Sequence, residues 1–132
     1  MINNKIIDSL MKGDQDFFTT LDTSTEEGKK QLSVFSSNKS YKKISDYIGK
    51  QITFNAVYMK KIEIKGSVAI QTAIQTPNGE IFKSTSEGIA KSVLVAIDYF
   101  GYPDKWEEEI WFEIREVNTR QNRNYFKLQL VD

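Results

Sequence analysis

The sequence predicts a mainly β protein: a small antiparallel barrel of five strands, with one helix between the third and fourth strands and a helical extension at the N-terminus. Residues 52–85 and 110–131 alternate apolar and polar side chains with the period of two that is typical of half-buried strands. Residues 86–100 change to a helical period. We therefore divide the chain into a helical N-terminal extension, 1–40, and a barrel domain, 41–132.

Residues 1–21 begin with a short amphipathic stretch, whose apolar side chains lie near helical spacing before Gly13. An isolated helix of this length is only marginally stable. We expect it to dock on its own domain. The alternative is self-association, in which residues 1–21 dock on a neighbouring subunit.

Residues 22–40 predict a second helix of two to three turns, with Leu32 and Phe35 pointing inward. Its start carries two pairs with the spacing of a capping box, which are Ser24 with Glu27 and Thr23 with Glu26. Residues 41–51 follow as a helical turn. The basic and aromatic side chains of that turn, which include Tyr41 and Lys43, are interpreted as part of a solvated turn with half-buried tyrosines, and ligand contact is the alternative.

The first barrel strand, 52–64, carries apolar residues on both faces, as a strand bent around a barrel does. A turn at 65–67 leads to the second strand, 68–76. The sequence Pro77-Asn78-Gly79 is a hairpin signal and leads to the third strand, 80–85.

The helix predicted for 86–100 presents one apolar face, formed by Ile89, Val93, Ile97 and Phe100. Ser86 is its expected N-cap, and Gly101 followed by Pro103 ends it. After an acidic connector, two alternating arms from Ile110 to Val131 form a hairpin. Its loop holds two arginines and no apolar residue.

Three strands, a helix and a hairpin follow the chain order of the OB-fold, a five-stranded barrel. An open α+β sheet with one helix, and a cold-shock-like or SH3-like barrel with an insertion, are the alternatives.

The composition excludes several functions. The chain has no cysteine and no histidine, so it lacks the usual nucleophile, general base and zinc ligands. We expect no enzymatic activity and no cofactor. The formal net charge is zero, so nucleic-acid binding would depend on a local basic patch. No apolar run approaches the ~20 residues of a membrane span and no signal peptide is evident; we expect a cytoplasmic protein with no membrane partner.

An OB barrel usually binds oligonucleotides on its second and third strands and in the loops beside them. Single-strand binding combines cations with aromatic rings on which bases stack. Such residues recur in this chain where that face is expected. The candidates are Tyr58, Lys60, Lys61, Lys65, Phe82, Lys83, Trp111, Arg115, Arg120, Arg123, Tyr125 and Lys127.

Four stretches carry a resemblance to a known family: TSTEEGKKQLSVFSSNKS, ISDYIGKQITFNAVYM, IFKSTSEGIAKSVLVAIDYFG and the terminal NRNYFKLQLV. Together they resemble the single-stranded DNA-binding proteins of small tailed phages with protein-primed replication. The resemblance implies an OB-fold protein that coats displaced strands in the host cytoplasm. Its ligand would be single-stranded DNA, with RNA as the alternative. The rival hypothesis is a protein-interaction or structural accessory domain, anchored by Trp111 and Tyr125.

Overall fold

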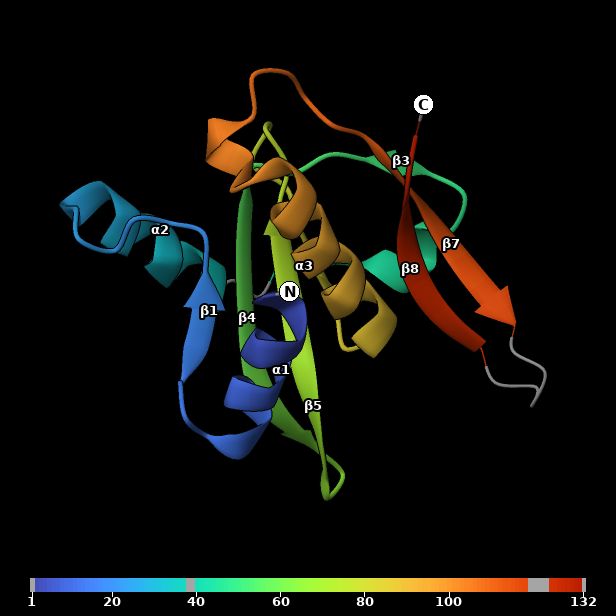
Figure 1. The fold of residues 1–132 in the computed structure, drawn as a ribbon, viewed down its shortest axis with the longest axis horizontal. Helices are drawn as coiled ribbons and strands as arrows, with labels where there is room; N and C mark the ends of the chain where they lie inside the picture. The colour runs from blue at the N-terminus through green and yellow to red at the C-terminus, as the bar shows by residue number, and fades with distance from the viewer. Residues whose placement is uncertain (1, 38–39, 119–123, 132) are drawn as a thin grey trace.

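The computed structural model describes residues 2–37, 40–118 and 124–131. The described chain is mainly β, as predicted, with two sheets and three α-helices (Figure 1). One sheet has five strands in the order β1-β4-β5-β6-β2, and the other has the order β3-β7-β8. The strands are β1 Phe17–Thr19, β2 Lys42–Lys43, β3 Gln51–Ile52, β4 Ala56–Ile64, β5 Ser67–Gln75, β6 Ile81–Ser84, β7 Phe112–Asn118 and β8 Asn124–Leu130. The helices are α1 Ile2–Lys12, α2 Glu26–Ser37 and α3 Glu87–Phe100, with short 3-10 turns at Ile44–Tyr47 and Pro103–Lys105.

Strands β4, β5 and β6 form an antiparallel meander joined by the two predicted turns. Lys65 and Gly66 both have positive φ, 49° and 82°, as the tight two-residue turns that match strand twist require. The second turn contains Gly79 with φ 90°, and its ends are joined by the Thr76 N–H, which donates to the Glu80 carbonyl at 2.9 Å. These local signals fix the register of the meander.

The strand predicted for 52–64 is interrupted at residues 53–55. β3 pairs with β7, whereas β4 pairs with β5 and β1. At the break, the Thr53 hydroxyl donates to the Ile110 carbonyl at 2.6 Å. One stretch of chain therefore contributes a strand to each sheet.

The predicted barrel is not observed, because β8 has no strand partner on its outer edge among the described residues. Helix α3 covers that edge instead. The Ser92 hydroxyl accepts a hydrogen bond from the Leu128 N–H at 3.1 Å, and the Ser86 hydroxyl donates to the Phe126 carbonyl at 3.4 Å. Gly88 permits the close approach, since a Cβ there would overlap the Phe126 carbonyl oxygen.

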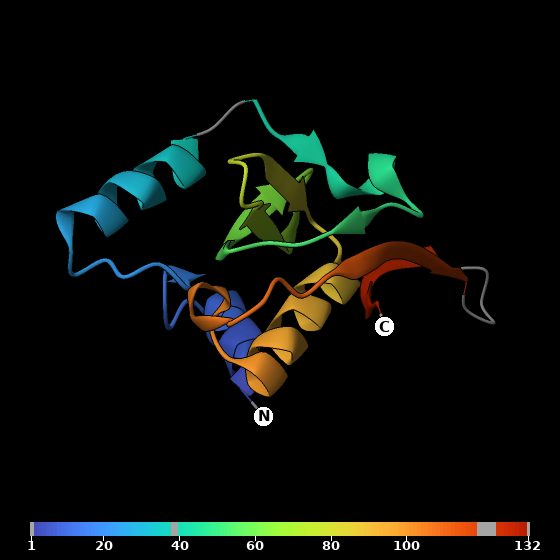
Figure 2. The same ribbon diagram turned by 90° about the horizontal axis from the view of Figure 1, so that it is seen from above.

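Helices α1 and α3 lie together on one face of the five-stranded sheet (Figure 2). Helix α3 confirms the element predicted for 86–100, and Gly101, with φ 81°, follows its last residue. Phe100 departs from the prediction, because it is 42% exposed and not buried. The buried core between these helices and the sheet includes Ile7, Leu10, Val57, Met59, Ile74, Phe82, Ile89, Val93 and Ile97.

Helix α2 lies on the opposite side of that sheet (Figure 2). Its N-cap is Thr25, whose hydroxyl accepts the Gly28 N–H at 3.0 Å, and not Ser24 or Thr23 as predicted. Ser24 is instead held by Asp22, whose carboxylate accepts its N–H at 3.0 Å. Among the described helices, none has the length and apolar character needed to cross a membrane.

Candidate nucleic-acid interface

The strand register brings aromatic and basic residues together on the face of the five-stranded sheet opposite α1 and α3, which we call the outer face. Directly paired residues of neighbouring strands point to the same side of a sheet. One row across the sheet pairs Tyr58 with Ala73, Ala73 with Lys83 and Lys83 with Lys43. The next row pairs Phe17 with Lys60 and Lys60 with Gln71.

Three aromatic rings run along one side of the outer face. The ring centroids of Phe17 and Tyr58 are 5.7 Å apart, and those of Tyr58 and Phe35 of α2 are 6.4 Å apart. Phe35 is 1% exposed, so α2 seals one end of this row. Burial raises the pKa of the half-buried Tyr58 phenol above its ordinary value.

The charges on the outer face are all positive among the paired strand residues that the structure describes. They come from Lys43, Lys60 and Lys83. Acidic side chains border the same face near Ala56 and Gln75, in a pocket that is also lined by Asp22, Glu27, Asp104, Glu107, Glu108 and Glu109. Burial, followed by repulsion from the Lys60 charge, lowers the pKa of Lys83. The Lys83 ammonium also lies 4.6 Å from the ring centroid of Tyr41, within cation–π range. The outer face is a local basic patch on a chain of zero net charge.

A cleft of about 260 Å³ adjoins the outer face at the seam between the two sheets. It shares Lys43, Gln71 and Lys83 with that face and reaches Phe126 of β8. The cleft therefore lies between β6 of one sheet and β8 of the other, which are not paired with each other in the part of the chain that the structure describes. Tyr41, Ser45, Ser84 and Thr85 complete its lining.

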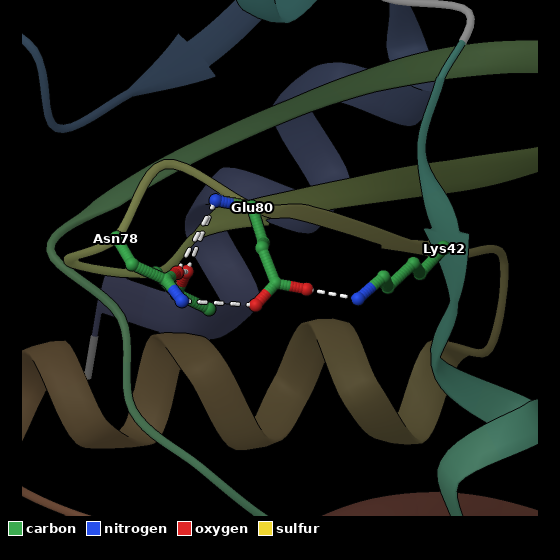
Figure 3. Close-up of polar contacts among 4 residues, drawn as sticks. Lys42, Asn78 and Glu80 are labelled. Atoms are coloured by element: carbon green, nitrogen blue, oxygen red, sulfur yellow. Dashed lines mark hydrogen bonds and ion pairs between the residues drawn. The ribbon is translucent and has the colours of Figure 1, made fainter.

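A small polar network fixes the edge strand β2 (Figure 3). The Lys42 ammonium pairs with the Glu80 carboxylate, which also accepts a hydrogen bond from the Asn78 amide at 3.0 Å. The hydrogen bond from Lys42, and then that from Asn78, hold the pKa of Glu80 below its usual range. Because Lys42 is anchored on one side of β2, Lys43 points to the other side, onto the outer face.

The structure brings three of the predicted site residues together on the outer face: Tyr58, Lys60 and Lys83. Lys61 points to the opposite side, where its ammonium donates to the Met11 carbonyl at 3.3 Å. Phe82 is a core residue with 7% exposure, so its ring is not available for stacking.

Other predicted residues lie away from the outer face. Lys65 is exposed at the tip of the β4–β5 hairpin. Arg115 faces Lys127 across the β7–β8 pair and donates to the Gln129 side chain at 2.9 Å. Tyr125 and Lys127 line a largely apolar groove beside α3.

Trp111 and Tyr125 are 41% and 40% exposed, respectively. Trp111 lies just before β7, and its carbonyl accepts the Val131 N–H at 3.0 Å. Arg120 and Arg123 fall outside the described residues. The predicted residues therefore do not form one surface: some lie on the outer face, others on or beside the β7–β8 hairpin, and Lys61, Lys65 and Phe82 lie in neither place.

Sequence reasoning missed Phe17, because a three-residue strand is too short for a period to stand out. The available signal was the pair Phe17-Phe18, of which Phe18 is buried and Phe17 is 38% exposed. Tyr41 and Lys43 were recognised as basic and aromatic, but were assigned to a solvated turn. Their position on the outer face depends on the parallel pairing of β2 with β6, which no local pattern reveals.

This sheet face carries rings and cations beside a cleft, with α2 packed over one end of it. These are the components of a surface for unpaired nucleic acid. The comparison with family profiles agrees. Residues 11–131 match the family described as phage single-stranded DNA-binding protein, of the Phi29 type. The chain belongs to this family, as its resemblance predicted, and single-stranded DNA is the ligand that the family name states. Searches of the curated proteins and of the solved structures return no match.

Proposed function

We propose that this protein coats single strands displaced during replication or recombination, in the cytoplasm of a phage-infected host, and that the strand lies along the outer face. The observation that carries the proposal is the register of β1, β4, β5 and β6. It aligns two accessible rings and three lysines on one side of a sheet without a carboxylate among them. The ligand that complements such a face is a polyanion with flat bases.

Two terms would supply the affinity. A base stacked on an aromatic side chain contributes about 1–3 kcal/mol, with little dependence on the base. Lysines that contact phosphates release counterions, so the affinity falls as salt rises. The three lysines of the outer face can neutralise only a few phosphates, so few counterions are released and the salt dependence is modest. We therefore infer binding with little sequence preference.

We also propose that the architecture is an opened variant of the OB-fold. The meander β4–β6, helix α3 and the hairpin β7–β8 keep the chain order of that fold. The stretch containing β3 and β4 joins both sheets, as a strand shared around a barrel does. At the seam, α3 replaces the last strand pairing.

The β7–β8 hairpin offers a second candidate surface, away from the outer face. Arg115, Tyr125 and Lys127, with Trp111 at the start of the hairpin, remain candidates for a second set of contacts. Arg120 and Arg123 in the hairpin loop belong to the same proposal on the basis of sequence alone. Their joint replacement by alanine is expected to weaken binding, and unchanged binding would confine the interface to the sheet.

A gel-shift competition tests the proposed function. Labelled oligothymidine is bound at low salt and challenged with unlabelled single-stranded DNA, RNA or duplex DNA of equal length. The proposal predicts displacement by single-stranded DNA and little displacement by duplex. Quenching of tryptophan fluorescence on binding is expected if Trp111 is part of the path. No shift at low salt, or equal displacement by duplex, would contradict the proposal.

A further inference from the structure

We propose that Phe17 stacks on a nucleobase, and that the short strand β1 makes the N-terminal extension part of the DNA interface. This inference depends on the proposed function, because it names a contact within the same face. It assigns a binding role to a residue outside the predicted barrel domain.

Accessibility singles out Phe17 among the three rings of the outer-face row. Phe35 projects from α2 onto the sheet and is 1% exposed, and Tyr58 lies half-buried between the other two rings. Phe17 is 38% exposed at the open end of the row. A base approaching the row from solvent therefore contacts Phe17 first. The ring of Tyr58 packs against Phe17 in a tilted arrangement on the other side.

The cross-strand partner of Phe17 supplies the charge that a nucleotide needs. Phe17 pairs directly with Lys60, and residues paired in this way have Cβ atoms about 4.5–5.5 Å apart. A base on the ring therefore leaves its phosphate within reach of a flexible lysine. One nucleotide can use both side chains at once.

β1 holds Phe17 in place before any ligand arrives. The Thr19 hydroxyl donates to the Val57 carbonyl at 2.8 Å, and the Thr20 hydroxyl accepts the Val57 N–H at 3.0 Å. Phe18, on the other side of the strand, is buried in the core. A ring fixed in this way loses little conformational entropy on binding.

Charge favours DNA over a second copy of the chain as the occupant of this site. A protein surface laid over Phe17 would also bury Lys60, which is costly without an anionic partner. A phosphate provides that partner. The same reasoning applies to Lys83, which lies on the same face.

The test compares Phe17→Leu, which keeps apolar bulk but removes the ring, with Phe17→Tyr, which keeps the ring. Tyr102→Leu is the matched control, because Tyr102 is 41% exposed and its ring contacts Phe18 on the side of β1 opposite the outer face. Affinity for labelled oligothymidine is measured by fluorescence anisotropy. We expect Phe17→Leu to weaken binding by roughly 5- to 150-fold, the range for one stacked base. Phe17→Tyr and Tyr102→Leu should bind within about twofold of the wild type.

Several results would overturn the inference. If the wild type binds and Phe17→Leu binds equally well, Phe17 does not stack on DNA, although the proposed function stands. If Phe17→Leu lowers the mass in sedimentation without changing affinity, the occupant is a second copy. If Phe17→Leu does not fold, Phe17→Trp replaces it; a folded Phe17→Trp that loses binding contradicts the inference, since a larger ring stacks at least as well. Absence of wild-type binding would instead reject the proposed function.

Discussion

The Ser92 hydroxyl of α3 accepts a hydrogen bond from the backbone N–H of Leu128 at 3.1 Å, and so occupies a position that a neighbouring strand would take in a barrel. The same hydroxyl donates to the Gly88 carbonyl at 2.7 Å. An edge strand is thus covered by helix side chains and not by another strand. This contact explains how two sheets form one stable unit without closing.

Replacing Ser92 by alanine leaves the Leu128 N–H without its partner in a buried position. We expect Ser92→Ala to lower the free energy of unfolding by about 1–3 kcal/mol and to speed exchange of the Leu128 amide proton. Denaturant unfolding and hydrogen exchange measure the two effects. Ser33→Ala, on the exposed side of α2, is the control. Unchanged stability together with unchanged exchange would mean that α3 does not cover β8.

At position 88 the protein should be more stable with glycine than with alanine, which is the reverse of the usual order in helices. In an open helix, Gly→Ala stabilises by up to ~1 kcal/mol. Here the added methyl group would overlap the Phe126 carbonyl oxygen and lie 3.0 Å from the Tyr125 ring. We expect Gly88→Ala to destabilise by about 1–3 kcal/mol, measured by thermal or urea unfolding. Lys91→Ala, exposed on the same helix, controls for general effects, and a stabilised Gly88→Ala would refute the close approach.

Local chemistry predicted the meander turns and α3 because each is determined within a few residues. Positive-φ turns, the helical period and Gly101 can all be recognised from neighbouring side chains. The absence of a closed barrel could not be predicted, because it depends on whether the edge of β8 is hydrogen-bonded by α3 or paired with β6. That competition is between contacts far apart in the sequence.

The predicted site shows a second limit. Lys60 with Lys61, and Phe82 with Lys83, are neighbours in strands, so their side chains point to opposite sides of the sheet. Each pair could contribute only one member to any face. The alternation of side chains along a strand shows that the two members of each pair lie on opposite faces. It does not show which face is open to a ligand, because that depends on α1 and α3, which cover one face of the sheet.

The ion pair between Lys42 and Glu80 predicts an acid-sensitive edge strand. Because the folded pKa of Glu80 is lowered, its stabilisation is complete above the ordinary glutamate pKa and is lost as the pH falls through the lowered value. We expect Glu80→Gln to lower stability at neutral pH and to flatten the loss on acidification. Urea unfolding at a series of pH values measures this, with Glu63→Gln, exposed near the hairpin tip, as the control. Parallel pH curves for Glu80→Gln and the wild type would contradict the role of the pair.

The most direct measurement compares Lys60→Ala with Lys61→Ala in oligothymidine binding at several salt concentrations. These adjacent residues point to opposite sides of β4, so the pair distinguishes the outer face from the covered face with matched chemistry. If single-stranded DNA lies on the outer face, Lys60→Ala lowers the affinity. It also reduces the slope of log affinity against log salt concentration by about one unit or less. Lys61→Ala changes neither quantity. Equal losses in both variants, or a loss in Lys61→Ala alone, would contradict that placement.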